Sequence, residues 1–229
     1  MMSDIPEASI VLRGLLHDRY SCRAFRPDPV PRAVIEDLLR MAGRAPSWCN
    51  AQPWEVIVTA APATEAFRAR MMKAVLEESG SSDFEFPSGY SGARQERRRT
   101  CGWQLYEAVG VKKGDRAGSA MQMLENFRLF GAPHVAIVTS ARELGPYGAM
   151  DCGGFVTAFT LAAAAAGLGS IAQAAIAGYS DQVRAHFDIP DDRVIACAIS
   201  FGYADEDHPA NGFRTERAAL GEVLDWREE

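Results

Sequence analysis

Three polar stretches of the sequence carry side chains suited to holding an anionic ligand. The first is DRYSCRAF (Asp18–Phe25), in which Arg19, Ser21 and Arg23 alternate. Alternate side chains of an extended segment point the same way, and guanidinium groups form fork-like, charge-assisted bonds to phosphates and carbonyl edges. Taken alone, however, this stretch favours a solvated basic turn.

The second polar stretch is APSWCNAQPW, which joins a helical pattern to an apolar strand pattern. Pro46 removes a backbone donor and disfavours helical geometry in the residue before it, so it ends the helix. Ser47 and Asn50 are then free to donate hydrogen bonds outward. Trp48 suits the wall of a flat pocket or a protein interface equally well. Trp54, at the start of the strand, is expected to pack in the core.

The third stretch lies in the C-terminal third of the chain. GLGSIAQAAI follows a long apolar run, and Gly167 and Gly169 permit close backbone approach or left-handed geometry. The glycines alone also fit a plain turn between a helix and a strand. NGFRTER then supplies two arginines, Arg214 and Arg217. Arg214 could either bind the ligand or be a solvated surface side chain.

The composition disfavours several classes of protein. The chain has 229 residues, 48% hydrophobic and 24% charged, which is typical of a globular domain with a sizeable core. A net charge of −6 disfavours DNA or an anionic membrane as the main partner. No run approaches the ~20 apolar residues of a membrane span, and the first residues lack the pattern of a secretory signal. We therefore expect no nucleic-acid partner and no membrane partner.

The cysteines and histidines predict a cytoplasmic protein without a metal site. Five cysteines, an odd number with no C-x-x-C pair, are typical of free thiols in a reducing compartment. No histidine lies near Cys49 in the sequence, so we interpret this residue as a small buried thiol and not as a nucleophile. The four histidines stand far apart, which gives no support to a His-based metal centre.

Hydrophobic periodicity predicts one α+β domain over residues 1–229. Helices are expected at 7–17, 30–45, 62–79, 93–110, 118–130, 150–166 and 181–190. Strands are expected at 54–60, 134–140 and 193–204, and a Gly- and Ser-rich loop at 80–92.

Two segments need more surface than one small domain offers. The run 150–166 is apolar on nearly every face, which is typical of a helix buried all round. Asp151 lies at its start, where an acidic group suits the helix dipole, and we assign it no catalytic role. The tail 205–229 is polar with few apolar anchors, so it is expected to lie along another surface. Both features are typical of obligate dimers.

In this order, the three stretches resemble the FMN-dependent nitroreductase family. DRYSCRAF is similar to the family pattern R-x-S-x-R-x-F, and PSWCNAQPW is similar to P-S-x-x-N-x-Q-P-W. The apolar helix, the G-L-G turn and the terminal G-Y…R segment are also similar to the family. The likeness covers residues 10–225 and is weakest over residues 62–130.

The resemblance implies a nitroreductase-like sandwich, with a central, mostly antiparallel sheet flanked by helices, that works as an interlocked homodimer. FMN would sit at the subunit interface and contact both chains, and the tail 205–229 would pack on the partner subunit. The cofactor-binding residues that the resemblance implies are Arg19, Tyr20, Ser21, Arg23, Pro46, Ser47, Trp48, Asn50, Gln173, Ala174, Ala175, Arg214 and Arg217.

Within that set, the resemblance implies individual roles. Arg19 and Arg217 would reach the FMN phosphate. Arg23 would lie near the flavin N1/O2 edge, where positive charge stabilises the anionic reduced flavin. A backbone N–H of Ala174 or Ala175 would point to flavin N5. No protein residue is expected to act as a general base, because the flavin does the chemistry.

The implied activity is hydride transfer from NADH or NADPH, through flavin N5, to a small electron-poor acceptor such as a nitroaromatic or a quinone, with ping-pong kinetics. One alternative is an FMN-dependent reductive dehalogenase-like enzyme, although such relatives generally lack the SWCNAQPW form. Another is a non-enzymatic flavin carrier or redox sensor, which would bind FMN without turning over NAD(P)H.

Residues 80–130 are expected to shape the substrate slot. The run RQERRRT within them could grip the 2′-phosphate of NADPH, but a solvated helix face with ion pairs explains the same pattern. A nucleic-acid-binding role for this run is disfavoured by the acidic total and by the lack of interleaved aromatic residues.

Overall fold

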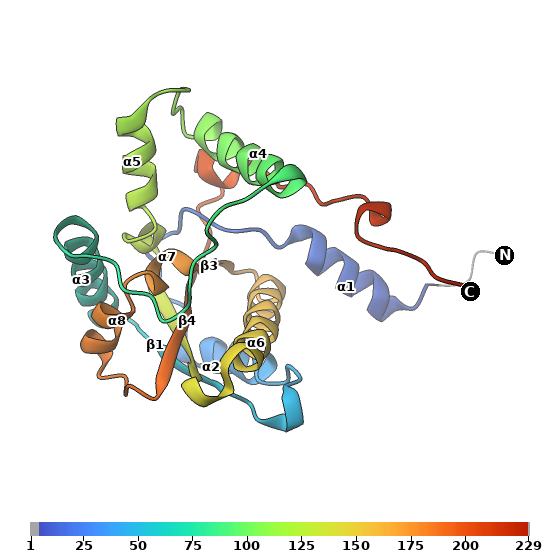
Figure 1. Ribbon diagram of the computed structural model, residues 1–229, viewed down its shortest axis with the longest axis horizontal. Coiled ribbons are helices and arrows are strands. Elements are labelled where there is room, and N and C mark those ends of the chain that lie inside the picture. The colour runs from blue at the N-terminus through green and yellow to red at the C-terminus, as the bar shows by residue number, and fades with distance from the viewer. Residues whose placement is uncertain (1–4, 229) are drawn as a thin grey trace.

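The computed structural model describes residues 5–228 and contains, in that range, one four-stranded sheet (Figure 1). Neighbouring strands pair antiparallel in the order β1-β2-β4-β3. The strands are β1 (Trp54–Val58), β2 (His134–Ala141), β3 (Gly169–Gln173) and β4 (Arg193–Gly202). The predicted α+β class and antiparallel sheet are confirmed, and β3 is a strand that the sequence pattern did not predict.

The helices are α1 (Glu7–Asp18), α2 (Arg32–Ala42), α3 (Ala63–Glu77), α4 (Gly92–Ala108), α5 (Arg116–Leu124), α6 (Gly145–Ala165), α7 (Ala174–Ala177) and α8 (Ser180–Phe187). Short 3-10 turns cover Trp48–Asn50, Leu129–Gly131, Arg142–Leu144, Pro209–Asn211 and Leu220–Glu222. Helix α6 begins five residues earlier than expected because Pro146 fits its first turn, where no N–H is needed. Asp151 therefore lies inside α6 and not at its start.

Helices cover both faces of the sheet because its central strands are apolar on both sides. Along β2, Ala136 and Val138 pack in one cluster with α2 and α6, whereas Val135 and Ile137 pack in another with α3, α7 and α8. This alternation is the two-residue period of a strand. The result is a three-layer body whose sheet is buried between two layers of helices (Figure 1).

Helix α6 packs against the sheet on one side and leaves its other side uncovered. Phe155 and Phe159 are buried, and Trp54 stacks on Phe155 with ring centroids 5.3 Å apart, which confirms the expected core role of Trp54. On the opposite side, Met150 is 69% exposed, so α6 is not buried all round within one chain. By length and composition alone, Arg142–Ala165 could cross a membrane, but core helices of soluble proteins pass the same test.

Asp83 fixes the loop between α3 and α4 to the sheet. Its side chain is 10% exposed and accepts hydrogen bonds from the Ile195 backbone N–H (2.8 Å), Arg142 (3.0 Å) and Arg184 (2.8 Å). Burial alone would raise the pKa of Asp83, but these donors outweigh it and hold the pKa below the usual aspartate value. The Gly- and Ser-rich loop predicted at 80–92 is therefore irregular but anchored.

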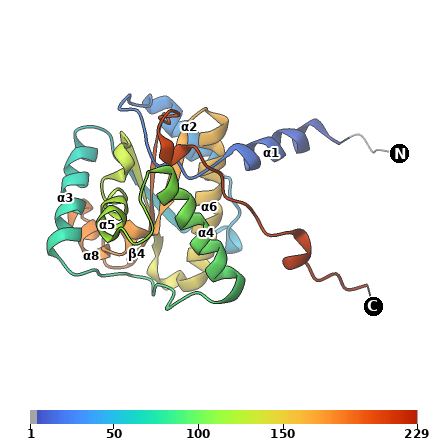
Figure 2. The ribbon, with the colours of Figure 1, turned by 90° about the horizontal axis from the view of Figure 1, so that it is seen from above.

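Helix α1 and the tail after residue 212 project from the body on the same side (Figures 1 and 2). No α1 side chain is buried in the described chain. The tail leaves Leu220, Val223 and Trp226 exposed, with Trp226 at 70%. Both segments thus present apolar side chains that the described residues do not cover.

Candidate active site

The first polar stretch runs as an extended segment from the end of α1 along β3. Cys22 donates its backbone N–H to the Ser170 carbonyl (3.1 Å), and Ser21 and Ser170 form an isolated parallel bridge. Cys22 and Ala24 are buried, whereas Ser21 and Arg23 are half-buried. The alternation predicted for this segment is therefore confirmed.

Arginines from the two ends of the chain meet at one cavity of about 190 Å³ between α1 and the tail. Of the predicted residues, those that line it are Arg19, Tyr20, Ser21, Arg214 and Arg217. The Arg214 guanidinium lies over the Tyr20 ring, 3.7 Å from its centroid, which is a cation–π contact. Arg214 Nη1 also donates to the carbonyls of Asn211 (2.7 Å) and Phe213 (2.9 Å), so this guanidinium is held on two sides.

Asn211 joins the tail to the first polar stretch. Its side chain is buried, with Oδ1 accepting from the Arg23 backbone N–H (2.7 Å) and Nδ2 donating to the carbonyls of Ala24 (2.9 Å) and Asp205 (2.8 Å). All hydrogen-bonding capacity of this amide except one acceptor position is thereby used. The backbone carbonyl of Asn211 accepts a hydrogen bond from Arg214. Asn211 therefore fixes two of the predicted arginines, Arg23 and Arg214.

Arg23 lies beside this cluster, where it is half-buried. Its Nη1 donates to the Ser21 carbonyl (3.0 Å), and its guanidinium carbon lies 5.7 Å from the centroid of the Phe213 ring. Burial lowers the pKa of Arg23, although a guanidinium stays charged in proteins. A partly desolvated positive charge acts more strongly on a neighbouring anion than one in water.

Gln173 ends β3, and Ala174 and Ala175 begin α7. The Gln173 side chain is buried, donating Nε2 to the Asn126 carbonyl (2.7 Å) and accepting from Ser200 Oγ (2.5 Å). This amide is therefore engaged within the protein, and it fixes the strand-to-helix turn. Ala174 is exposed, and N–H groups in the first turn of a helix have no partner within it.

The second polar stretch lies far from the arginine cavity within one chain. The Trp48 backbone N–H donates to Asp151 Oδ2 (3.1 Å), and the Trp48 ring packs edge-on against Tyr147, with centroids 4.3 Å apart. A second cavity around Arg19, of about 170 Å³, reaches Ala164 at the other end of α6. The rise of an α-helix puts positions 151 and 164 about 20 Å apart.

The backbone of the second polar stretch is tightly wound. Cys49 and Asn50 have φ values of 51° and 57°, in the left-handed region that costs energy for these residues. Ser47 Oγ accepts from the Gln52 backbone N–H (2.9 Å), which helps to hold this shape. Pro46 and Asn50 are exposed, and so is Cys49, whose predicted burial is wrong.

Residues 16–203 match the sequence profile described as the nitroreductase family. The chain belongs to the nitroreductase family. It is 36% identical over 210 residues to Nitroreductase NfnB of Mycolicibacterium smegmatis, covering 91% of this chain and 89% of that protein. It is 32% identical to the 4-nitrobenzoate reductase of a Nocardioides species, covering 89% of this chain and 85% of that protein.

Solved structures agree with this family assignment. The crystal structure of the FMN-dependent nitroreductase NfnB from Mycobacterium smegmatis, in complex with NADPH, superposes with a TM-score of 0.93. The identity is 34%, and the match covers 97% of this chain and all of that one. The predicted nitroreductase-like fold is therefore confirmed.

In this member of the nitroreductase family, the predicted site residues fall into two groups. The first and third stretches come together at the end of α1 and along β3, whereas the second stretch stands alone at the other end of α6. Sequence reasoning missed Asn211 and Phe213, which hold the arginines. Both belong to the segment NGFRTER, whose arginines alone were assigned a role.

Proposed function

We propose that this nitroreductase-family chain is an FMN-dependent oxidoreductase that transfers hydride from NADPH or NADH to a small electron-poor acceptor, such as a nitroaromatic or a quinone. One observation carries the proposal, the convergence of Arg19, Arg214 and Arg217 on a single cavity. Full-length relatives named as a nitroreductase and a nitrobenzoate reductase favour this activity over dehalogenation or flavin carriage.

The donor set at the cavity fits the phosphate end of FMN. A dianionic phosphate needs at least two cations, and Arg19, Arg214 and Arg217 supply three guanidinium groups. Tyr20 and the carbonyls beneath Arg214 hold that guanidinium in place before a ligand arrives. Less conformational entropy is then lost on binding. Ser21 adds a hydroxyl to the same wall.

When bound, FMN would supply the redox chemistry, the transfer of hydride from a reduced nicotinamide to the acceptor. The chain contributes binding, orientation and charge. Arg23 provides a partly buried positive charge for the N1/O2 edge. Ala174 and Ala175, with their small side chains, leave space for a flat ring and offer backbone N–H groups to it. Gln173 orients that turn through its buried amide.

We further propose that the site is completed by a second copy of this chain. The second polar stretch lies at the Asp151 end of α6, whereas the second cavity around Arg19 reaches Ala164, about 20 Å further along that helix by its rise. One chain therefore does not bring Pro46, Ser47, Trp48 and Asn50 to a ligand held by the arginines. In a homodimer the partner's Ser47 and the partner's Asn50 would reach the FMN held by this chain. The uncovered side of α6, helix α1 and the tail supply the apolar surface that such a dimer needs.

Within this proposal the chain is a single domain, residues 1–229, that works in the cytoplasm. Residues 80–130 shape the acceptor slot, and this role is supported by Asp83, which anchors the loop at the start of this region to the sheet. The Phe86 ring lies against Gly178, directly after α7, which brings the loop close to the proposed flavin ring.

The proposal is tested on the purified protein. We expect a yellow dimer that releases FMN on heating and bleaches with NADPH or NADH under anaerobic conditions. Arg217→Ala should weaken FMN binding by about 10- to 100-fold, the value of a charge-assisted phosphate contact. Arg23→Ala should slow flavin reduction more than it weakens FMN binding. Arg40→Ala, which removes an exposed guanidinium on α2, is the matched control. A colourless monomer that retains no FMN would overturn the proposal.

A further inference from the structure

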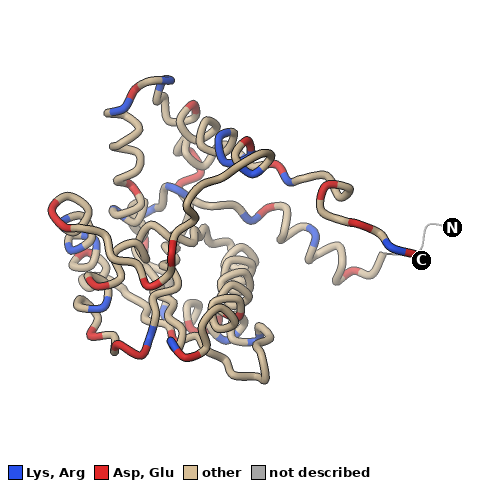
Figure 3. Tube along the Cα trace, viewed as in Figure 1, with Lys and Arg blue, Asp and Glu red and all other residues tan. Residues whose placement is uncertain are grey.

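Helix α4 and the turn into α5 carry a net positive charge, whereas the rest of the chain is acidic. Residues 92–117, here called the basic arm, contain seven basic and three acidic side chains, a net charge of +4 in a chain whose total is −6. Figure 3 shows these lysines and arginines along α4 and at the turn into α5. A local field of this sign attracts anionic ligands.

The arginines of α4 divide between its two sides. Arg97 pairs with Glu222 of the tail (2.7 Å), and Arg98 lies over the Tyr90 ring at 5.4 Å from its centroid. Among the described residues, the side chain of Arg99 makes no hydrogen bond or ion pair. At 100° per residue it lies one turn before Trp103 on the outer side of α4.

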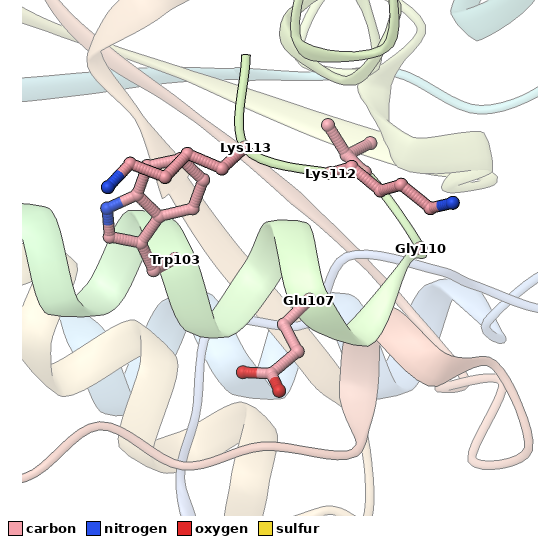
Figure 4. A pocket seen from close by; sticks show the side chains of 6 residues that line it. Trp103, Glu107, Gly110, Lys112 and Lys113 are labelled. Carbon is pink, nitrogen blue, oxygen red and sulfur yellow. The ribbon is translucent and has the colours of Figure 1, made fainter. Parts of the chain in front are cut away.

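A cavity of about 500 Å³ opens on that outer side, lined by Trp103, Glu107, Gly110, Val111, Lys112 and Lys113. Figure 4 shows Trp103, Lys112 and Lys113 around this cavity, with the Glu107 carboxylate pointing away from both lysines. Trp103 is 42% exposed, so a large part of its ring is open to a ligand. Neither lysine makes a side-chain hydrogen bond or ion pair in the described chain.

An exposed indole beside unpaired cations suits a nucleotide that carries an extra phosphate. Purines stack on aromatic rings, a contact that strengthens nucleotide binding. Lysine ammonium and arginine guanidinium groups bind phosphate oxygens through charge-assisted hydrogen bonds. The 2′-phosphate of the adenosine is the one group that NADPH has and NADH lacks.

Helix α4 stands between the outer cavity and the arginine cluster that is proposed to hold the FMN phosphate. On the inner side of the helix, Gln104 Nε2 donates to the Arg214 carbonyl (3.4 Å), so α4 lies against the arginine cluster. Trp103, the residue before Gln104, lies on the outer side. A helix with its side chains is about 10–12 Å across, and an extended nicotinamide dinucleotide is longer than that.

We propose that the outer side of the basic arm, Trp103 with Lys112, Lys113 and Arg99, binds the adenosine 2′-phosphate end of the hydride donor and makes NADPH the preferred donor. This inference rests on the proposed FMN-dependent activity. The 2′-phosphate would thus be bound chiefly at the turn between α4 and α5, and not by the whole arginine run RQERRRT that the sequence suggested.

Direct binding of fragments tests the site without any turnover. Calorimetry on the FMN-loaded protein compares 2′,5′-ADP with 5′-AMP. We expect 2′,5′-ADP to bind at least about ten-fold more tightly, and the Lys112→Ala/Lys113→Ala double variant to lose that ratio. Lys73→Ala is the matched control, because Lys73 is the one remaining lysine of the chain and is exposed on α3. Trp103→Leu should weaken both fragments by a similar factor and keep the ratio.

Anaerobic stopped-flow reduction then links the site to the donor. In the double variant the concentration of NADPH that gives half-maximal reduction should rise about ten-fold, while the NADH value and both limiting rates stay unchanged. Equal binding of the two fragments to the unmodified protein, or an equal loss for both donors in the double variant, would overturn the inference. A flavin that neither donor reduces would instead refute the proposed function, and the fragment comparison would still decide whether the site exists.

Discussion

Replacement of Asn211 by alanine should destabilise the protein and loosen FMN together. The Asn211 side chain is 4% exposed and makes three hydrogen bonds, with the Arg23 N–H (2.7 Å), the Ala24 carbonyl (2.9 Å) and the Asp205 carbonyl (2.8 Å). Each such bond contributes about 0.5–1.5 kcal/mol, and a buried donor left without a partner costs about 1–3 kcal/mol. We therefore expect Asn211→Ala to lower the free energy of unfolding by about 3 kcal/mol, the upper part of the range for single substitutions.

The same substitution should weaken FMN binding, because Asn211 fixes the backbone of Arg23 and its segment carries Arg214. We expect about a ten-fold rise in the FMN dissociation constant, equivalent to about 1.4 kcal/mol. The measurements are urea unfolding followed by circular dichroism, and titration of the FMN-free protein by flavin fluorescence. Unfolding is compared at one fixed FMN concentration, since a ligand that binds the native state raises its apparent stability.

Asn126→Ala is the matched control for Asn211→Ala. The Asn126 side chain makes one exposed hydrogen bond, to the Met123 carbonyl at 3.1 Å, so its loss should cost under about 1 kcal/mol. A loss of stability no larger than that of the control would refute the bonding argument. A large loss of stability with unchanged FMN affinity would refute the link between Asn211 and the arginine cluster.

Three further substitutions have directions set by the structure. Tyr20→Leu removes the ring beneath Arg214 and should weaken FMN binding by about 2- to 30-fold, the value of a cation–π contact, whereas Tyr20→Phe should not; flavin fluorescence titration measures both. The pKa of Asp83 is lowered in the folded state, so its stabilising contribution is present above the unfolded value of about 3.9 and is lost as pH falls through the folded pKa. Asp83→Asn should therefore flatten the fall of urea midpoints between about pH 5 and pH 2. Arg193→Lys removes the guanidinium that donates hydrogen bonds to Glu55, Thr139 and the Pro53 carbonyl. It should lower the free energy of unfolding, measured in urea, by about 2–4 kcal/mol. A decrease below about 1 kcal/mol would contradict that bonding scheme.

Strand β2 was predictable because its local sequence pattern matches its position in the centre of the sheet. The alternation of Val135, Ala136, Ile137 and Val138 matches a sheet covered on both faces, and the pattern alone identified it. Strand β3 was not predictable in this way. Its residues, GSIAQ, contain a single β-branched side chain, and they form a strand because β4 offers a partner edge, with Ile171 opposite Ser200.

The candidate site shows the same division between local and long-range information. Arg19, Arg214 and Arg217 could be selected because their segments resemble family motifs, and they line one cavity. The role of Asn211 was not readable there, because an asparagine in a polar tail is ordinary until the fold buries it. Only the chain path brings its amide to the backbone of Arg23, 188 residues away in sequence.

The hydrogen bonds of Asn211 link cofactor binding to the contact between the N-terminal and C-terminal segments of the chain. Helix α1 has no buried side chain and the tail is largely exposed. The first polar stretch, which pairs with Ser170, and Asn211, which bonds Arg23, help to hold both segments to the body. A phosphate held by Arg19, Arg214 and Arg217 would cross-link these same two segments. Because α1 and the tail also carry the uncovered apolar side chains, a ligand that orders them would order the surface on which the proposed second copy would bind. Linkage then requires that dimer formation strengthen FMN binding by the same free energy by which FMN strengthens the dimer.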